Sequence, residues 1–252
     1  MFTSPKTTLY QGLQTSEPLE LEADGEPVQV DQCQIVLSRS GKTNIRCYGN
    51  GIFIVSNTVL SCDADFPDSE LVSVGEGANI YFYRCRFQNS DRGILIGSNE
   101  HREETHSSIS ATFVECVFED IGKWNPFARY GQIRLFRCLV KNWGKPGFSS
   151  SDGFLVGKHA QGLAGSCVFI QKPLLSCLNK GTLQEMFRGF PLLVPGFAKA
   201  AHAEYGGQIR LYNCYKNRWW LYIKNHYGKY MTQEEATELE THIESVVPKL
   251  SK

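Results

Sequence analysis

Apolar and polar residues alternate in a short phrase that recurs along the chain and is usually followed by a cysteine. Within each copy, β-branched and aromatic residues alternate with polar ones, which is the period of a strand with one buried face. Clear copies are Asn79–Phe87, Ser110–Phe118, Gln132–Val140 and Gln208–Tyr215. Looser copies surround Cys167 and Asn57, and Asn57 stands in the place of the cysteine. The pattern predicts many short strands of one design.

The spacing between copies is uneven, whereas the cysteine keeps a fixed phase within each copy. Cys85 and Cys116 are 31 residues apart, and Cys116 and Cys138 are 22 apart. Such spacing is typical of a parallel β-helix, in which each coil buries its inner face on its neighbours and surplus residues leave as loops. We therefore predict an all-β fold with one domain over residues 1–252, a lead-in over 1–27 and coils over 28–230.

Two segments depart from the strand pattern. Residues 181–207 contain a predicted short helix at Leu183–Phe190, followed by an apolar run. This excursion is expected to cover either the side of the solenoid or, as a lid, a binding groove. Thr232–Glu235 is a capping box that opens an apolar helical face ended by Pro248, so we predict a helix over 232–248 that caps the last coil.

Composition and charge limit the kinds of partner that the protein is expected to bind. The 252 residues are 42% hydrophobic, and 26 basic residues balance 26 acidic ones. The protein has no net charge that would attract nucleic acid or a membrane, so we expect neither as a partner. The first residues lack the features of a secretory signal and no apolar run reaches ~18 residues. We expect a cytosolic protein, or a secreted one if a leader has been removed.

The nine cysteines are expected to be buried, reduced and stacked, because most occupy the inward phase of the repeated phrase. Disulfides or a metal site are the alternatives. A polar excursion also carries His101, Glu103, Glu104 and His106. Its spacing matches no common zinc motif, so a solvated loop is expected there.

Two ordered motifs resemble the pectate lyase family of polysaccharide lyases. They are Ser90–Ser98 and Gly122–Cys138, within a similarity that spans roughly residues 38–170. The resemblance implies a right-handed parallel β-helix. It also implies abstraction of the proton α to a uronate carboxylate, with calcium and basic side chains stabilising the enolate and an arginine acting as base.

Carried over one position at a time, the family's functional residues are only partly retained. The motif lysine falls on Arg92, which keeps the charge, and the arginine proposed as base falls on Trp124, which cannot accept a proton. The arginine after the motif proline falls on Phe127, while the next arginine is retained as Arg129. The motif histidine falls on Arg134.

The calcium ligands implied by the resemblance are replaced as well. Their positions fall on Ser40, Lys42, Ser69 and Ser73. Calcium requires several anionic oxygens, and a cationic Lys42 would repel it. A shifted site built from nearby carboxylates is the alternative, and its candidates are Asp63, Asp65, Asp68 and Glu70. We expect no metal and no other cofactor.

These substitutions favour a repurposed, metal-independent enzyme that isomerises or cyclises a small, largely apolar metabolite in a biosynthetic pathway. A pericyclic step such as an intramolecular Diels–Alder reaction is one form of this chemistry. Arg129 and Arg92 are the predicted catalytic residues. The predicted substrate-binding residues are Trp124, Phe127, Arg134 and Lys42.

Two other classes of function stay open at this point. One is a calcium-independent lyase of pectate or alginate that uses Arg129 or Arg92 as base. The other is a non-catalytic β-helix that binds carbohydrate or serves as a scaffold. The ligand is accordingly expected to be a small molecule or a saccharide.

Overall fold

The structure is a computed structural model, and it describes most of the first two thirds of the chain and short parts of the remainder. The described residues are 7–38, 41–63, 69–75, 77–97, 109–123, 125–143, 152–171, 201–203, 207–212, 214–217, 228–230, Thr237 and Thr241.

The strands stack in three parallel sheets, and the longest strands bend from one sheet into the next. Sheet I stacks β3 (Leu19–Glu22), β6 (Thr43–Tyr48), β9 (Glu70–Val74), the end of β11 (Arg86–Ile96), the starts of β14 (Phe127–Phe136) and β16 (Leu155–Gly165), and β18 (His202–Ala203). Sheet II stacks β1 (Thr8–Gln11), β4 (Val28–Asp31), β7 (Gly51–Ser56), β10 (Ala78–Tyr83), β12 (Ser110–Val114), the ends of β14 and β16, β19 (Gln208–Tyr212) and β21 (Gly228–Tyr230). Sheet III stacks β2 (Gln14–Thr15), β5 (Gln34–Leu37), β8 (Val59–Cys62), the start of β11, β13 (Val117–Lys123), β15 (Leu139–Trp143), β17 (Val168–Gln171) and β20 (Tyr215–Asn217).

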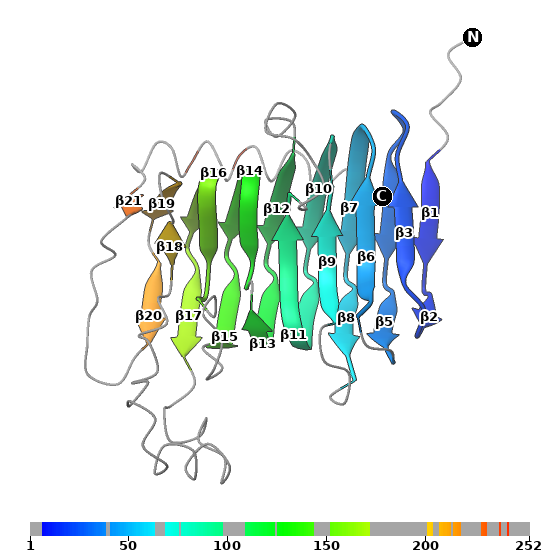
Figure 1. Cartoon of the computed structure of the whole chain (residues 1–252), viewed down its shortest axis with the longest axis horizontal. Helices are drawn as coiled ribbons and strands as arrows, with labels where there is room; N and C mark the ends of the chain where they lie inside the picture. The colour runs from blue at the N-terminus through cyan, green and yellow to red at the C-terminus, as the bar shows by residue number, and fades with distance from the viewer. Residues whose placement is uncertain are drawn as a thin grey trace, which may run out of the picture.

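The chain is a right-handed parallel β-helix, as predicted. Every described strand pairing is parallel, and each strand pairs with its counterpart in the next coil. Figure 1 shows the coils side by side, from β1 at one end to β21 at the other. Right-handed winding is the hand that parallel crossover connections almost always take. Residues from successive coils therefore form rows across each outer face.

Each coil turns from sheet II to sheet III at one residue in the left-handed backbone conformation. Its N–H donates to a carbonyl of the next coil, as Arg84 N does to Val114 O at 3.0 Å and Glu115 N to Phe136 O at 2.9 Å. The residues of this turn row are Gly12, Gln32, Asn57, Arg84, Glu115, Arg137 and Ser166. Inter-coil hydrogen bonds thus hold a conformation that costs most side chains about 1–2 kcal/mol.

Six of the eight described cysteines lie directly after this turn row and stack in the core. The thiol row consists of Leu13, Cys33, Thr58, Cys85, Cys116, Cys138, Cys167 and Cys214. The Cys116 thiol donates to the carbonyls of Val114 at 3.4 Å and Phe82 at 3.5 Å. The eight described cysteines are free, and all but the partly buried Cys214 are buried. This confirms the predicted burial for seven of these eight thiols.

One detail of the predicted repeat is wrong. Thr58, and not Asn57, occupies the cysteine position, and its hydroxyl donates to Ser56 O at 2.7 Å much as the thiols do. Asn57 lies one residue earlier, in the turn row, with φ of 49°. Asparagine tolerates the left-handed conformation better than most residues, which explains why it occurs there.

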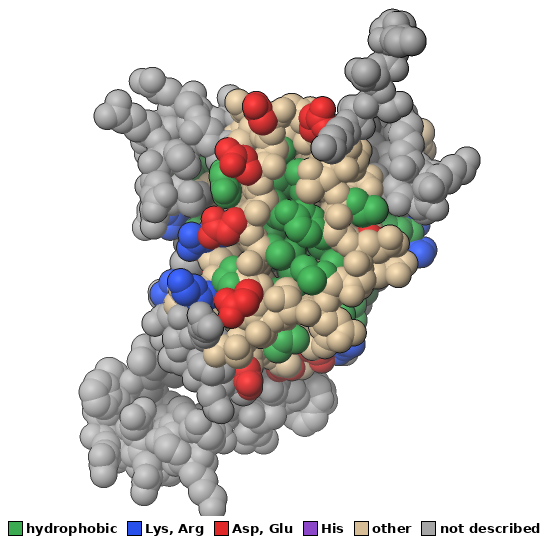
Figure 2. All heavy atoms as spheres, turned by 90° about the vertical axis from the view of Figure 1, so that its right-hand side faces the viewer, with side chains coloured by type: hydrophobic (Ala, Val, Ile, Leu, Met, Phe, Trp, Pro, Cys, Tyr) green, Lys and Arg blue, Asp and Glu red, His purple; other side chains and the backbone are tan. Residues whose placement is uncertain are grey.

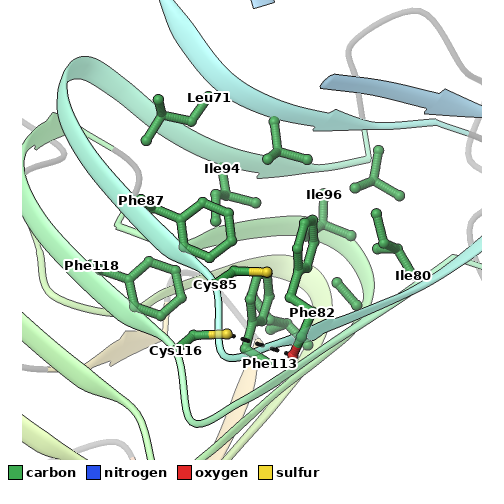
Figure 3. Packing of buried hydrophobic residues seen from close by; sticks show 14 of the residues in the cluster. Leu71, Ile80, Phe82, Cys85, Phe87, Ile94, Ile96, Phe113, Cys116 and Phe118 are labelled. Atoms are coloured by element: carbon green, nitrogen blue, oxygen red, sulfur yellow. Dashed lines mark hydrogen bonds between the residues drawn. The ribbon is translucent and has the colours of Figure 1, made fainter. Parts of the chain in front are cut away.

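Aromatic rings of neighbouring coils stack in the interior (Figure 3). The Phe82 and Phe113 centroids are 4.8 Å apart with the rings 3° from parallel, and those of Phe87 and Phe118 are 5.0 Å apart at 12°. Phe82 and Phe87 meet edge to face at 5.1 Å. Such contacts add to the free energy of burying each ring. The scaffold under the outer faces is therefore densely packed.

The first coil begins inside the segment that the sequence assigns to a lead-in. Strands β1, β2 and β3 pair with β4, β5 and β6, so residues 8–22 already form a coil. In β3 the outward residues are Glu20 and Glu22. Because they are acidic, this segment resembles a charged, solvated stretch in the sequence and its strand was not predicted. Figure 2 looks onto this end and shows hydrophobic side chains at its centre with acidic ones along one side.

The predicted excursion and the predicted helix are described only in part. Within 181–207, His202–Ala203 form β18 of sheet I, and residues 181–200 lie outside the described residues. Of the predicted helix over 232–248 only Thr237 and Thr241 are described; both are helical, and the Thr241 hydroxyl donates to Thr237 O at 2.9 Å. Among the described residues, no helical segment has the length and hydropathy needed to cross a bilayer.

Candidate active site

One row of side chains crosses the outer face of sheet I. The backbone register aligns Arg46 with Ser73, Ser73 with Leu95, Leu95 with Phe127, and Phe127 with Leu155. The residues on either side of this row, such as Ile94 and Ile96, point into the core, so the row itself points outward. It is polar toward the N-terminal coils and apolar toward the C-terminal ones.

The apolar part of this row is a cluster separate from the core. Leu95, Phe127 and Leu155 pack on one another and have 7%, 6% and 1% of their surface exposed. The sequence predicts Phe127 in an apolar site, and the structure supplies its two aliphatic partners. A small part of the Leu95 and Phe127 surface is accessible, and this part is apolar.

Arg129 lies beside this cluster. Its guanidinium carbon is 5.9 Å from the centroid of the Phe127 ring, within the range of a cation–π contact. Gly97 on β11 and Gly157 on β16 lie next to Arg129 on the two neighbouring strands, because each follows a residue that pairs with Ala128. A Cβ on Gly157 would lie 3.2 Å from the Arg129 Cα. A Cβ on Gly97 would lie 2.9 Å from the Tyr130 ring, so both neighbours of Arg129 are positions where a side chain would not fit.

A second row, nearer the start of the sheet I strands, contains a buried carboxylate. The register aligns Thr43 with Glu70, Glu70 with Arg92, and Arg92 with Lys123. The Thr43 hydroxyl donates to Glu70 Oε2 at 3.2 Å, while the buried Oε1 finds no partner. Burial raises the pKa of Glu70 to about 7, against the lowering effects of Thr43, Arg92 and Arg46. A carboxyl with such a pKa can exchange a proton near neutrality.

Sequence reasoning missed Glu70 as a functional candidate except as one carboxylate of a shifted calcium site. In β9 Leu71 is in the core as well as Val72 and Val74, so the alternation of the strand does not define the side to which Glu70 points. No signal in the sequence pattern therefore indicated that an oxygen of Glu70 is buried.

The other predicted site residues do not all come together. Arg92 is three residues before Leu95 on β11, which separates their backbones by about 10 Å. Lys42 is exposed and its carbonyl accepts a bond from the Glu70 N–H at 2.9 Å. Arg134 lies on sheet II, because β14 bends at Gly131, so the structure does not bring it together with Phe127. Trp124 lies outside the described residues.

The calcium ion implied by the family does not fit the residues at its expected place. Ser73 lies between Arg46 and Leu95, and Ser69 is buried with its carbonyl bonded by the Ser90 hydroxyl at 2.8 Å. Nowhere in the described part of the chain do three His, Cys, Asp or Glu side chains gather closely enough to hold a metal. Of the alternative carboxylates, Asp65 and Asp68 lie outside the described residues, as does the predicted polar loop over 98–108.

The fold and these two outer rows define a pectate-lyase-like β-helix with an altered site. The family model for pectate lyase matches residues 47–182, more than half of the chain. The protein therefore belongs to the pectate lyase family. None of the curated proteins matches the chain.

Several solved structures are similar in fold. A mutant of Bacillus subtilis pectate lyase and a pectate lyase bound to a hexasaccharide are each 12% identical, with TM-scores of 0.46 over 79% of this chain and 58% of theirs. A polygalacturonate lyase gives a TM-score of 0.47 at the same identity. The chain thus spans less than two thirds of the length of these proteins.

Proposed function

We propose that this protein is a cytosolic, metal-independent enzyme that isomerises or cyclises a small, largely apolar substrate bearing a carbonyl or carboxylate. The observation that carries the proposal is the outer cluster of Leu95, Phe127 and Leu155 with the Arg129 guanidinium beside the Phe127 ring. An apolar cluster next to a cation suits a ligand with an apolar body and one polar group.

The chemistry asks little of the protein beyond holding the substrate. An intramolecular cyclisation makes and breaks bonds within one molecule, so it needs neither a co-reactant nor an obligatory base. The cluster would hold the reacting atoms about 3–3.5 Å apart, which lowers the entropic part of the barrier. Arg129 would donate hydrogen bonds to the carbonyl oxygen as charge develops on it, and Arg92 is a second cation on the same sheet.

Polyenes with a conjugated carbonyl, incubated with the protein in the presence of a chelator, test this function. The expected result is product formation faster than the spontaneous reaction, with a changed product ratio. Arg129→Gln should slow turnover by roughly a hundredfold, the scale for losing one oxyanion donor. The matched control is Arg137→Gln, since Arg137 lies 4.9 Å from the Phe136 ring centroid on a different face. Rates and product ratios equal to those without protein would refute the proposal.

A second candidate function is favoured by Glu70. A calcium-independent β-elimination requires a base for the proton α to the carboxylate and a cation for the enolate, after which the glycosidic oxygen leaves and a C=C bond remains. Glu70, with its pKa of about 7 and Arg92 beside it in register, offers both more directly than an arginine base.

The two functions are separated by a simple assay. Pectate or alginate added in the presence of chelator would give a rising absorbance from unsaturated uronate if the lyase assignment is correct. That rise should disappear in Glu70→Gln and persist in Glu20→Gln, an exposed carboxylate near Arg46. Glycan binding without any absorbance change would point instead to a non-catalytic β-helix.

A further inference from the structure

Five cysteines of the thiol row stack without interruption through successive coils. The strand pairings on either side of each position align Cys85 with Cys116, Cys116 with Cys138, Cys138 with Cys167, and Cys167 with Cys214. Aligned residues of neighbouring parallel strands have Cα atoms roughly 4.7–4.9 Å apart. Each adjacent pair therefore falls within the Cα separation of about 4.4–6.8 Å that a disulfide requires.

The thiols of the last two coils in this row also share one orientation. Cys167 Sγ donates to Gly165 O, two residues before it, at 3.2 Å. Cys214 Sγ likewise donates to Tyr212 O, two residues before it, and to Ala164 O of the preceding coil, both at 3.3 Å. Because the residues are aligned and the side chains point the same way, the two sulfur atoms are neighbours. A disulfide between them requires side-chain rotation and little movement of the backbone.

Access to solvent distinguishes this pair from the others. Cys214 packs against the core but is partly exposed. Cys85, Cys116, Cys138 and Cys167 each have at most 2% of their surface exposed. A dissolved oxidant reacts with a thiol that it can reach. Of the adjacent pairs in the row, only Cys167 and Cys214 include a thiol that such an oxidant reaches while the protein is folded.

The two thiols of this pair differ in acidity in a way that suits stepwise oxidation. The hydrogen bond from the Cys167 thiol lowers the pKa of Cys214, against the raising effects of burial and of Cys138. Burial raises the pKa of Cys167. The thiolate is the nucleophilic form of cysteine, so Cys214 is suited to react first and Cys167 second.

We infer that Cys214 is a site of reversible oxidation by hydrogen peroxide, and that Cys167 converts the oxidised Cys214 into a disulfide between two coils. The Cys214 thiolate attacks one peroxide oxygen, the O–O bond breaks, and hydroxide leaves and takes up the thiol's proton, so that Cys214 becomes a sulfenic acid. The Cys167 sulfur then attacks the Cys214 sulfur, the S–O bond breaks, and water leaves with the Cys167 proton. Peroxide is thus reduced to water while the two thiols are oxidised to one disulfide, which a dithiol reductant reverses.

The disulfide would join the coil of β16 and β17 to the coil of β19 and β20. Packing and backbone hydrogen bonds, such as Ser166 N to Tyr212 O at 2.9 Å, already connect these coils. A covalent bond between Cys167 and Cys214 would close a loop over residues 167–214 and restrain the later coil against separation. This chemistry takes place in the core, so it is independent of the proposed reaction on the outer face of sheet I.

Treatment of the folded full chain with hydrogen peroxide tests the site. Remaining thiols are alkylated in denaturant, and mass spectrometry of proteolytic fragments assigns any disulfide. The expected result is the loss of two thiols per chain, restored by dithiothreitol, with a bond between Cys167 and Cys214. Cys214→Ser should slow peroxide-dependent thiol loss by at least about tenfold, because the other thiols of the row are buried. Cys167→Ser should stop the oxidation at the sulfenic acid of Cys214, which dimedone traps.

Cys138→Ser is the matched control. It removes the other cysteine that neighbours Cys167, and it should form the disulfide like the wild type. Thr58, at the same position of an earlier coil, shows that the row accommodates a hydroxyl, which there donates to Ser56 O at 2.7 Å. Circular dichroism verifies that each serine variant is folded.

A disulfide that forms in the folded wild type and in Cys138→Ser, and that is lost in Cys214→Ser and in Cys167→Ser, would support the inference. It would be overturned if Cys214 stays reduced under peroxide that oxidises free cysteine, pairs with a different cysteine, or proceeds to sulfinic acid while Cys167 remains a thiol. Formation of the disulfide only in denaturant would overturn it as well. None of these measurements involves turnover of a substrate, so this inference and the proposed function fail or succeed separately.

Discussion

Replacing Glu70 by glutamine should make the protein more stable at alkaline pH and change little in acid. Burial raises the pKa of Glu70 from 4.5 to about 7. At ~1.4 kcal/mol per unit this corresponds to at most roughly 3 kcal/mol. The unfolded chain ionises near 4.5, so Glu70's favourable contribution is complete below that pH and is lost as the pH rises through 7. Above 7 the folded state holds an ionised carboxylate whose Oε1 lacks a partner.

Glutamine removes the titration while keeping an oxygen for the Thr43 hydroxyl, which donates at 3.2 Å. Urea unfolding of both proteins between about pH 4.5 and 8.5 measures the difference in free energy of unfolding at each pH. Other titrating groups are common to both proteins and cancel in that difference. We expect it to be near zero in acid and to grow by about 2–3 kcal/mol in favour of Glu70→Gln above pH 7.

Glu20→Gln is the matched control, because Glu20 is exposed and lies 3.7 Å from the same Arg46 that is near Glu70. Its difference from the wild type should stay small and vary little with pH, since exposed ion pairs contribute up to about 1 kcal/mol. A flat difference curve for Glu70→Gln, or one that favours the wild type at high pH, would refute the reasoning about this carboxyl.

Three further predictions follow from the scaffold. Phe113→Ala should lower the free energy of unfolding by about 3–5 kcal/mol, because it removes a ring that stacks on Phe82 at 4.8 Å; denaturant unfolding measures this. Ser166→Gly should raise it by about 1 kcal/mol, since Ser166 has φ of 51° and only its backbone N–H, which glycine retains, bonds the next coil; thermal unfolding checks the sign. Cys116 is fully buried and burial raises its pKa, so a thiol reagent should label Cys116 no faster than the protein unfolds.

The coil design could be predicted because it is local. Each copy carries its own alternation and its own cysteine, so the period of two and the inward phase are visible without knowing which coils touch. The one misassigned position, Asn57, arose because a turn residue and a core residue are adjacent. A shift of one residue exchanges them, and only the pairing of coils distinguishes the two.

The composition of the candidate site was only partly predictable. Phe127 and Arg129 are two residues apart on one strand, so their proximity follows from the period. The partners of Phe127 cannot be inferred from the period, because Leu95 is 32 residues before Phe127 and Leu155 is 28 residues after it. With coils of unequal length, no sequence spacing indicates which residues stack. The unbroken apolar run at Ile94–Ile96 was the available sign that Leu95 faces an apolar environment outside the core.

The bend within β14 explains why Arg134 lies on a different sheet from Phe127. A strand from Phe127 to Phe136 would present Phe127 and Arg134 in opposite phases if it were straight. Gly131 turns the backbone from one sheet to the other. The alternation of inward and outward residues before Gly131 therefore does not predict the orientation of residues after it. Glycine in the middle of a strand pattern signals such a bend.

Because each coil bonds only to the coils on either side of it, cohesion in this molecule is one-dimensional. A pulling force applied at one end would break the hydrogen bonds between one pair of coils at a time. The solenoid would then unfold in steps, and each step would release one coil. Unfolding of a terminal coil would leave the remaining coils folded. Unfolding would therefore spread from one end only as fast as the next pair of coils separates.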